Sequence, residues 1–181
     1  MYFSDALNKF ILMLSQDNVT LRTIEPTDVD FLYALENETE NWQVSQTVTP
    51  FSKQTLTDYA FSIHDITIQK QLRLIIEKSG ESVGAIDLFE YDAINQRAGV
   101  GLIVLAERRG EGIAVNALKL IEEYAFNILQ LSQLWCNILG NNTISQNLFD
   151  GLGYVKCGTK VGWTRTSSGW EDEHMYQLRR K

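Results

Sequence analysis

The sequence predicts one α+β domain in which a mixed, mostly antiparallel sheet of about seven strands is flanked by helices. The length of 181 residues suits a single hydrophobic core. Hydrophobic residues make up 44% of the chain and charged residues 22%, with 2 Pro and 12 Gly, which excludes collagen-like, low-complexity and mostly disordered proteins. Strand-like and helix-like patterns follow one another without an internal repeat or linker. We therefore expect a single domain over residues 1–181.

The first third of the chain combines one strand-like stretch with several helical ones. Apolar residues recur at helical spacing before residue 15, and Val19–Ile24 alternates as a strand does. The segment Glu36–Phe51 is polar, with no clear period. The expected elements are a lead-in helix within residues 1–17, a strand over Val19–Ile24, a helix capped by Thr27 and ending at Leu35, a loop over Glu36–Phe51, and a helix from Ser52 to about Asp65.

From Gln71 the apolar period changes from 3.6 to 2, which predicts an antiparallel meander. Its strands carry Leu72–Ile76, Val83–Leu88 and Arg97–Leu105, joined by turns at residues 79–81 and 91–96. After Gly112, apolar residues recur every three or four positions as far as Ile128, which predicts the longest helix.

The last third of the chain is predicted to add three strands and one short helix to the sheet. Glycines close the helix, and the segment between the last two strands is polar with two Trp residues. The expected elements are a strand over Leu134–Leu139, a helix over Thr143–Asp150, a strand over Tyr154–Val161, a loop over Trp163–His174, and a strand over Met175–Arg180. The predicted order is therefore β α α β β β α β α β β.

The net charge of −7 has the wrong sign for a surface that neutralises nucleic-acid phosphates. Cys136 and Cys157 are too few for a disulfide scaffold, which favours a reducing compartment. The apolar run Phe10–Leu14 is too short for a membrane span and lacks the basic stretch of a signal peptide. We expect a cytoplasmic protein that binds neither nucleic acid nor membrane.

The stretch Val104–Ala114 is the most informative for chemistry. It connects a predicted buried strand to the start of the longest helix through Gly110 and Gly112. Successive N–H groups at a helix start, aided by the helix dipole, bind phosphate, and Arg108 and Arg109 add positive charge. The plain alternative is that the two glycines only permit a sharp turn.

Two familiar phosphate-binding motifs do not match this stretch. A P-loop requires Lys after the last glycine, and no Lys follows either one. A dinucleotide fingerprint requires Gly or Ala where Val115 stands, together with parallel βαβ units.

The segment Arg109–Ala114 resembles the acyl-CoA-binding motif of the GCN5-related N-acetyltransferases (GNAT), Gln/Arg-x-x-Gly-x-Gly/Ala. The predicted order of elements matches that family, and Asn142–Tyr154 is similar to its Asn-x-x-Ala/Ser-x-x-Leu-Tyr-x-x-Leu-Gly-Phe segment. Within the family, Leu21–Asp28 and Met175–Arg179 look most like the branches that acetylate ribosomal-protein alanine and spermidine.

The resemblance implies that acetyl-CoA is the co-substrate and lies between the strand that ends at Leu105 and the strand that starts at Leu134. Its pyrophosphate is expected on the N–H groups of residues 109–115, and its amides are expected to pair with the backbone of residues 103–105. The implied cofactor-binding residues are Ile103, Val104, Leu105, Arg109, Gly110, Glu111, Gly112, Ile113, Ala114, Val115, Asn137, Asn142, Ser145 and Phe149.

The implied reaction needs a base, because an amine with a pKa near ~10.4 is almost fully protonated at neutral pH. Glu90 and Asp87 are the candidate bases by position, and for each the alternative is a solvated acid at a strand end. A strand N–H would stabilise the oxyanion. Many family members protonate the leaving thiolate with a Tyr, but Phe149 stands there. Ser145 or a water then serves, the thiolate leaves unassisted, or the protein binds CoA without efficient turnover.

The acceptor is expected to be a primary amine on a small molecule or peptide, and the acidity of the chain favours a cationic one. A polyamine, a protein N-terminus, an amino sugar and an aminoglycoside all remain open, as does a homodimer. Glu36 and Trp42 are candidate substrate residues, while Trp163 and Trp170 either wall the acceptor pocket or anchor a loop. No metal is expected, because His64 and His174 have no paired acids at ligand spacing.

The sequence therefore predicts an acetyl-CoA-dependent N-acetyltransferase. The alternative from another class is a CoA-binding sensor or interaction module.

Overall fold

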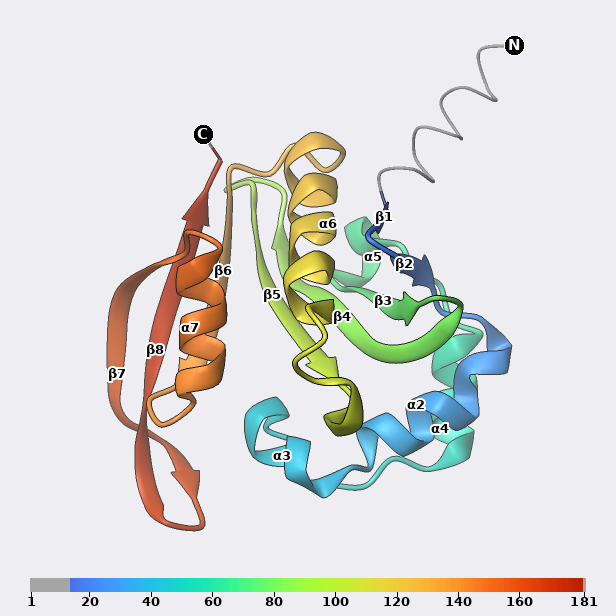
Figure 1. Ribbon diagram of the computed structural model, residues 1–181, viewed down its shortest axis with the longest axis horizontal. Helices are drawn as coiled ribbons and strands as arrows, with labels where there is room; N and C mark the ends of the chain where they lie inside the picture. Colours follow the sequence, from blue (N-terminus) through green and yellow to red (C-terminus); the bar gives the residue numbers. More distant parts are fainter. Residues whose placement is uncertain (1–13, 181) are drawn as a thin grey trace.

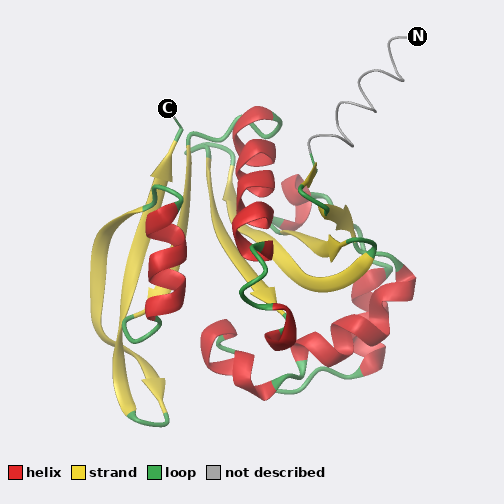
Figure 2. Cartoon of the chain, viewed as in Figure 1, coloured by secondary structure: helices red, strands yellow, loops and turns green. Residues whose placement is uncertain are grey.

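The computed structural model describes residues 14–180 and contains one eight-stranded sheet in the order β1-β2-β3-β4-β5-β6-β8-β7 (Figures 1 and 2). All neighbouring strands are antiparallel except β5 and β6. The strands are β1 (Ser15–Gln16), β2 (Val19–Thr23), β3 (Leu72–Lys78), β4 (Glu81–Asp92), β5 (Arg97–Val104), β6 (Gln133–Leu139), β7 (Val155–Thr166) and β8 (Gly169–Arg179).

Helices cover both faces of the sheet. The α-helices are α2 (Val29–Glu36), α3 (Thr39–Ser45), α4 (Lys53–Ala60), α5 (Ile66–Gln69), α6 (Ile113–Asn127) and α7 (Thr143–Gly151), with 3₁₀ turns at Pro26–Asp28 and Ala106–Arg108. Between residues 14 and 180, no helix is both long enough and apolar enough to span a membrane.

The alternation of β3 divides the core between these two faces. Leu74 and Ile76 belong to the larger apolar cluster, which also contains the buried stripe of α6, whereas Ile75 belongs to a smaller cluster with α2 and α4. The predicted helical period of α6 is confirmed, since its buried residues recur at three- and four-residue steps. These residues are Ile113, Ala117, Leu118, Leu120, Ile121 and Ala125.

The lead-in helix expected within residues 1–17 lies outside the described residues as far as residue 13 and stays untested there. Its last residues need a correction, because Ser15–Gln16 form the short strand β1. A second N-terminal expectation is also wrong. Thr27 does not cap the first helix. Glu25 and Asp28 form a capping box instead, in which the Glu25 N–H donates to Asp28 Oδ2 at 2.8 Å.

Two segments expected as loops are regular structure. The segment Glu36–Phe51 contains α3, which has no buried residue and therefore no apolar period to reveal it. The segment Trp163–His174 forms the ends of β7 and β8, which make one long hairpin beside α3 (Figure 1). The helix expected from Ser52 to Asp65 ends at Ala60, with Ser52 as its cap.

Candidate functional site

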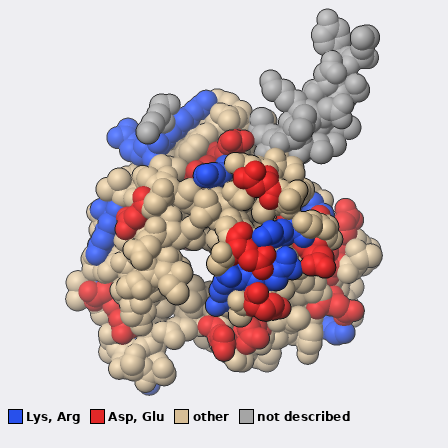
Figure 3. Space-filling model, viewed as in Figure 1, with Lys and Arg blue, Asp and Glu red and all other residues tan. Residues whose placement is uncertain are grey.

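A cleft opens where β5 and β6 separate. The two strands pair in parallel only from Arg97–Gln133 to Gly99–Trp135. Phe89 fills this junction, because its ring packs on Gly99, where a Cβ would lie 2.3 Å from it, and meets Trp135 edge-to-face at 5.2 Å. Beyond the junction lies a cleft of about 430 Å³, seen in Figure 3 as an opening between the half with β1–β5 and the half with β6–β8. Because Gly99 has no side chain, the Phe89 ring can lie on it and contact Trp135, and this aromatic pair forms the narrow end of the cleft.

The cleft-facing backbone of β5 follows from strand alternation. Leu105 donates its N–H to Val83 O at 2.9 Å, so the backbone groups of Leu105 and Ile103 point toward β4. The backbone groups of Leu102 and Val104 point to the opposite side, toward β6. Since β6 pairs with β5 only as far as Gly99, these groups have no partner on β6. Among the three residues expected to pair with the cofactor, Val104 alone therefore presents backbone groups to the cleft, and Ile103 lines it.

The glycine turn presents a row of backbone donors at the start of α6. Gly110 and Gly112 have φ of 82° and 75°, a region that favours glycine, and a Cβ at either position would meet nothing within 4 Å. Their role is therefore conformational. Within the described part of the chain, the N–H groups of residues 110–115 donate no hydrogen bond, and no side chain caps α6. Unpaired donors at the positive end of a helix dipole form an anion site.

The charged side chains around this turn bind one another. Arg108 donates to Glu111 at 3.0 Å and to Glu81 at 2.9 Å, and Lys78 donates to Glu111 at 2.8 Å. The hydrogen bonds from Lys78 and Arg108 lower the pKa of Glu111. Arg109 donates from Nε to Val104 O at 3.1 Å and from Nη2 to Asn41 Oδ1 at 3.0 Å. The charge of Arg108 is thus balanced by Glu81 and Glu111, whereas Arg109 contacts neutral acceptors and adds its positive charge to the row of N–H groups.

The opposite side of the cleft is formed by β6 and α7. Asn137, Asn142, Ser145 and Phe149 all line it. Asn142 Oδ1 also caps α7 by accepting the Ser145 N–H at 3.1 Å. Phe149 is 4% exposed and meets Tyr154 edge-to-face at 4.9 Å. The described lining contains no Tyr or His, and the Ser145 hydroxyl makes no hydrogen bond within residues 14–180.

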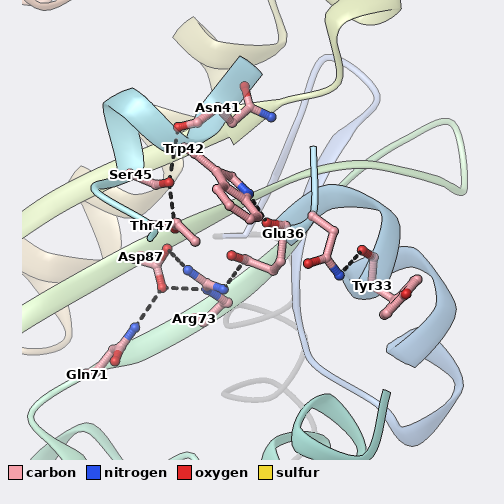
Figure 4. A network of polar contacts seen from close by, with 10 residues as sticks. Tyr33, Glu36, Asn41, Trp42, Ser45, Thr47, Gln71, Arg73 and Asp87 are labelled. Atoms are coloured by element: carbon pink, nitrogen blue, oxygen red, sulfur yellow. Dashed lines mark hydrogen bonds and ion pairs between the residues drawn. The ribbon is translucent and has the colours of Figure 1, made fainter. Parts of the chain in front are cut away.

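A buried ionic network lies on the side of the cleft formed by β3 and β4 (Figure 4). Arg73 donates to both carboxylate oxygens of Asp87, at 2.8 and 2.9 Å, and to Glu36 Oε1. Gln71 adds a third donor to Asp87 at 3.1 Å. Burial by itself would lower the pKa of Arg73, but Asp87 and Glu36 outweigh it and raise that pKa. Asp87 and Glu36 are therefore anchored carboxylates, and neither is the solvated acid that the sequence left open.

The other acidic groups at the cleft differ in how they are held. Glu90 lies on a β4 bulge at φ 49°, is exposed, and makes no hydrogen bond within residues 14–180. Glu173 is 3% exposed and accepts from Lys160 at 2.6 Å and from Gln46 at 3.2 Å. Trp42 belongs to α3, where its indole N–H donates to Glu36 O at 2.9 Å.

Sequence reasoning missed Arg73 and Glu173. Arg73 could have been noticed, because it is the charged residue that interrupts the apolar run of β3, but its position opposite Asp87 follows only from the register of the two strands. Glu173 carried no such pattern, since it fell in a segment expected to be a loop. Within residues 14–180, no three His, Cys, Asp or Glu side chains gather closely enough to bind a metal ion.

Comparison with known proteins agrees with this geometry. Residues 18–155 match the model of the family described as "Acetyltransferase (GNAT) domain". A spermidine N(1)-acetyltransferase of Escherichia coli K12 is 29% identical over 145 residues, which cover 78% of this chain and 75% of that protein. One from Vibrio cholerae is 25% identical over 165 residues, covering 90% and 94%.

Solved structures share the fold. The spermidine N-acetyltransferase from Vibrio cholerae in complex with CoA and spermine aligns with a TM-score of 0.80 at 20% identity, covering 91% of this chain and 96% of that one. A probable acetyltransferase aligns with a TM-score of 0.76 at 22% identity, covering 91% and 94%. The chain belongs to the GNAT acetyltransferase family, as the resemblance implied, and is an N-acetyltransferase.

Proposed function

We propose that the chain transfers the acetyl group of acetyl-CoA to a primary amine that is a cation in solution. The observation that carries this proposal is the row of unpaired N–H groups at residues 110–115, placed where the unpaired side of β5 leads into the start of α6. The row of N–H groups can bind a pyrophosphate, and the adjoining unpaired edge of β5 can pair with amide groups. This arrangement suits a ligand in which amide groups follow a pyrophosphate.

Acetyl-CoA supplies an activated thioester carbonyl to the attacking amine. The N–H groups of residues 110–115 hold the pyrophosphate, and Val104 offers its backbone N–H to the amides or to the developing oxyanion. Arg109 donates to the Val104 carbonyl oxygen, so the Val104 N–H is the backbone group of that residue that remains available in the cleft. Asn142 and Ser145 line the far side, next to Phe149.

The charge of the cleft supports a cationic acceptor. Its lining contains the carboxylates of Asp87, Glu90 and Glu173 against the single guanidinium of Arg73. An excess of carboxylates in a partly enclosed cleft attracts an ammonium group. Two curated relatives are named spermidine acetyltransferases, and spermidine is a polycation, which agrees with this sign of charge.

The amine must lose a proton before it attacks, which costs roughly 4–5 kcal/mol at pH 7 for a pKa near ~10.4. Asp87 is a poor base in this setting, because three donors already occupy its oxygens. Glu90 has unoccupied oxygens at the cleft rim, so we assign it the role of general base through a water molecule. Asp87, held by Arg73, then attracts the ammonium and orients it.

The leaving thiolate lacks the usual acid, because Phe149 carries no hydroxyl. The Ser145 hydroxyl is the candidate donor, since it lines the cleft and makes no hydrogen bond within residues 14–180. The same observation favours a second candidate function, a CoA-binding module with little turnover.

Release of free thiol from acetyl-CoA in the presence of primary amines tests both functions. We expect thiol release that depends on the amine, with formation of the N-acetyl product in equal amount. A Glu90→Gln variant should lower kcat, because its amide cannot accept the proton of the amine. Binding of CoA without thiol release for any amine would instead favour the binding module.

A further inference from the structure

A second groove adjoins the cleft and is lined by three tryptophans. It lies between α3 with its following loop and the tip of the β7–β8 hairpin, and its volume is about 650 Å³. Trp42 comes from α3, and Trp163 and Trp170 come from the hairpin. Gln43 and Gln46 line both this groove and the cleft, so the two lie on either side of the same α3 side chains.

The hairpin tryptophans both line this groove and are exposed to it. Trp170 pairs directly with Arg165 across the hairpin, and Trp163 lies in the irregular stretch between Lys160 and Thr164, where the register of β7 and β8 shifts. Trp163 is 59% exposed and Trp170 is 68% exposed, which is unusual for the largest aromatic side chain unless it contacts a ligand or partner.

Existing contacts hold two of the indoles in place. The Trp42 indole N–H donates to Glu36 O at 2.9 Å, which is close to the ionic network of the cleft (Figure 4). Lys160 Nζ lies 5.2 Å from the centroid of the Trp163 ring while also binding Glu173. The rings are thus positioned by the groups that form the acceptor side of the cleft.

The charge of the groove is opposite to that of the cleft. Among the described residues, no carboxylate lines the groove, and Arg165 is its charged residue. Lys160, against the Trp163 ring, adds a second cation nearby. A second ammonium group would be repelled here, whereas an uncharged flat ring can stack on indole and meet Thr, Ser and Gln side chains.

We propose that this groove binds an uncharged ring carried by the amine acceptor, while the ammonium group of the same molecule enters the acidic cleft. The inference rests on the proposed function and narrows its substrate class to ring-bearing primary amines. The ring is either aromatic or a pyranose, because a planar aromatic ring and the C–H face of a puckered pyranose both stack on an indole.

Steady-state acetyl transfer to four amines tests this inference on the full chain. Tyramine carries an aromatic ring, glucosamine a pyranose, butylamine no ring, and spermidine no ring but additional charge. We expect kcat/KM for tyramine or glucosamine to exceed that for butylamine about tenfold, which corresponds to about 1.4 kcal/mol of stacking. Which of the two ring amines is preferred identifies the source of the ring.

The double variant Trp163→Ala/Trp170→Ala should lower the ratio of ring amine to butylamine about tenfold, through KM rather than kcat. Trp163→Phe/Trp170→Phe keeps flat rings and should retain most of the ratio. Val161→Ala is the matched control, because Val161 lies on the same hairpin, is 81% exposed and does not line the groove.

Equal use of butylamine and the ring amines by the unaltered chain would overturn this inference and leave the proposed function standing. Preference for spermidine that is insensitive to both tryptophans would overturn it as well. If no amine is acetylated, both proposals fail.

Discussion

The two walls of the cleft are built by different means. The wall that we propose to bind the cofactor, the cofactor wall, is made of β5, the turn at residues 105–112 and the start of α6, and it presents backbone N–H groups from one continuous stretch. The wall that we propose to face the amine, the acceptor wall, is made of α3, β3, β4 and β8, and it presents side chains from distant parts of the chain. The cofactor wall therefore depends on glycines that are close together in the sequence. The acceptor wall depends on how distant strands align with one another.

Removing the central cation of the acceptor wall should have the largest effect. Arg73→Met leaves the carboxylates of Asp87 and Glu36 without a compensating cation, which costs about 3–5 kcal/mol of unfolding free energy. Urea unfolding at pH 7 measures this. Arg108→Met, on the cofactor wall, also removes two ion pairs, but its partners Glu81 and Glu111 are exposed, so its unfolding midpoint should stay near that of the unaltered chain. Equal losses would show that the two walls do not differ in this way.

On the cofactor wall, a substitution that changes the backbone conformation should weaken CoA binding. Gly112→Val forces a β-branched residue to a φ of 75°, which reorients the N–H groups at the start of α6. We expect CoA affinity, measured calorimetrically, to fall about 100-fold, or about 2.7 kcal/mol. Gly162→Val is the control, since Gly162 also has a positive φ of 56° and open space around it, but lies outside the cofactor wall. Unchanged affinity in Gly112→Val would remove this turn from the cofactor site.

This difference explains which features could be predicted from the sequence. The meander, α6 and the glycine turn each follow from short-range period or spacing, and the structure contains all three. The Arg73–Asp87 pair depends on the register of β3 and β4, which shifts between Ile76 and Glu77. Without that shift Asp87 would not stand opposite Arg73, so no local pattern predicts the pair.

The hairpin and α3 escaped prediction for a related reason. Almost every residue of β7 is at least partly exposed, so its strand has no apolar alternation. Helix α3 is held by polar contacts of Asn41, Trp42 and Gln46 instead of by a buried face. The apolar period of a sequence reveals an element only when one of its faces is buried. Helix α3 and strand β7 bury few side chains, so their sequences show no such period.

The half-buried acid Glu122 on α6 extends the comparison to a carboxylate that forms no ion pair among the described residues, although the charge of Lys119 acts on it. Burial raises the pKa of Glu122 to about 7, and Glu122 Oε1 and Tyr154 Oη are buried without a well-formed hydrogen bond in the described residues. A raised folded-state pKa means that the stabilisation is present below the unfolded value near ~4.5 and is lost as the pH rises through about 7.

Unfolding free energy should therefore fall by about 1–2 kcal/mol between pH 5 and pH 8, a figure that allows for partial solvent access to Glu122. Glu122→Gln should flatten this pH dependence. Glu123→Gln, at the exposed neighbouring position, should keep it. A slope that survives in Glu122→Gln would assign the titration to another group.

Phe149→Tyr tests the chemistry at the boundary between the walls. The added hydroxyl enters the cleft lining beside Ser145 and supplies a proton donor for the thiolate. We expect kcat to rise several-fold with KM for acetyl-CoA unchanged, measured by thiol release. Ser145→Ala should lower kcat in the unaltered chain and have less effect in the Tyr variant. A fall in kcat for Phe149→Tyr would mean that thiolate protonation does not limit the rate.

The short contact between β5 and β6 also has a mechanical consequence. Three residue pairs and the Phe89–Trp135 contact join the two halves of the sheet at the narrow end. At the wide end, α3 is tied to β8 by Gln46 and Glu173 and to the glycine turn by Asn41 and Arg109. The narrow end of the cleft is therefore held by strand pairing and an aromatic contact, whereas its wide end is bridged by two single hydrogen bonds. We expect the wide end to open for a thicker substrate by breaking these two hydrogen bonds, while every strand pair of the sheet stays intact.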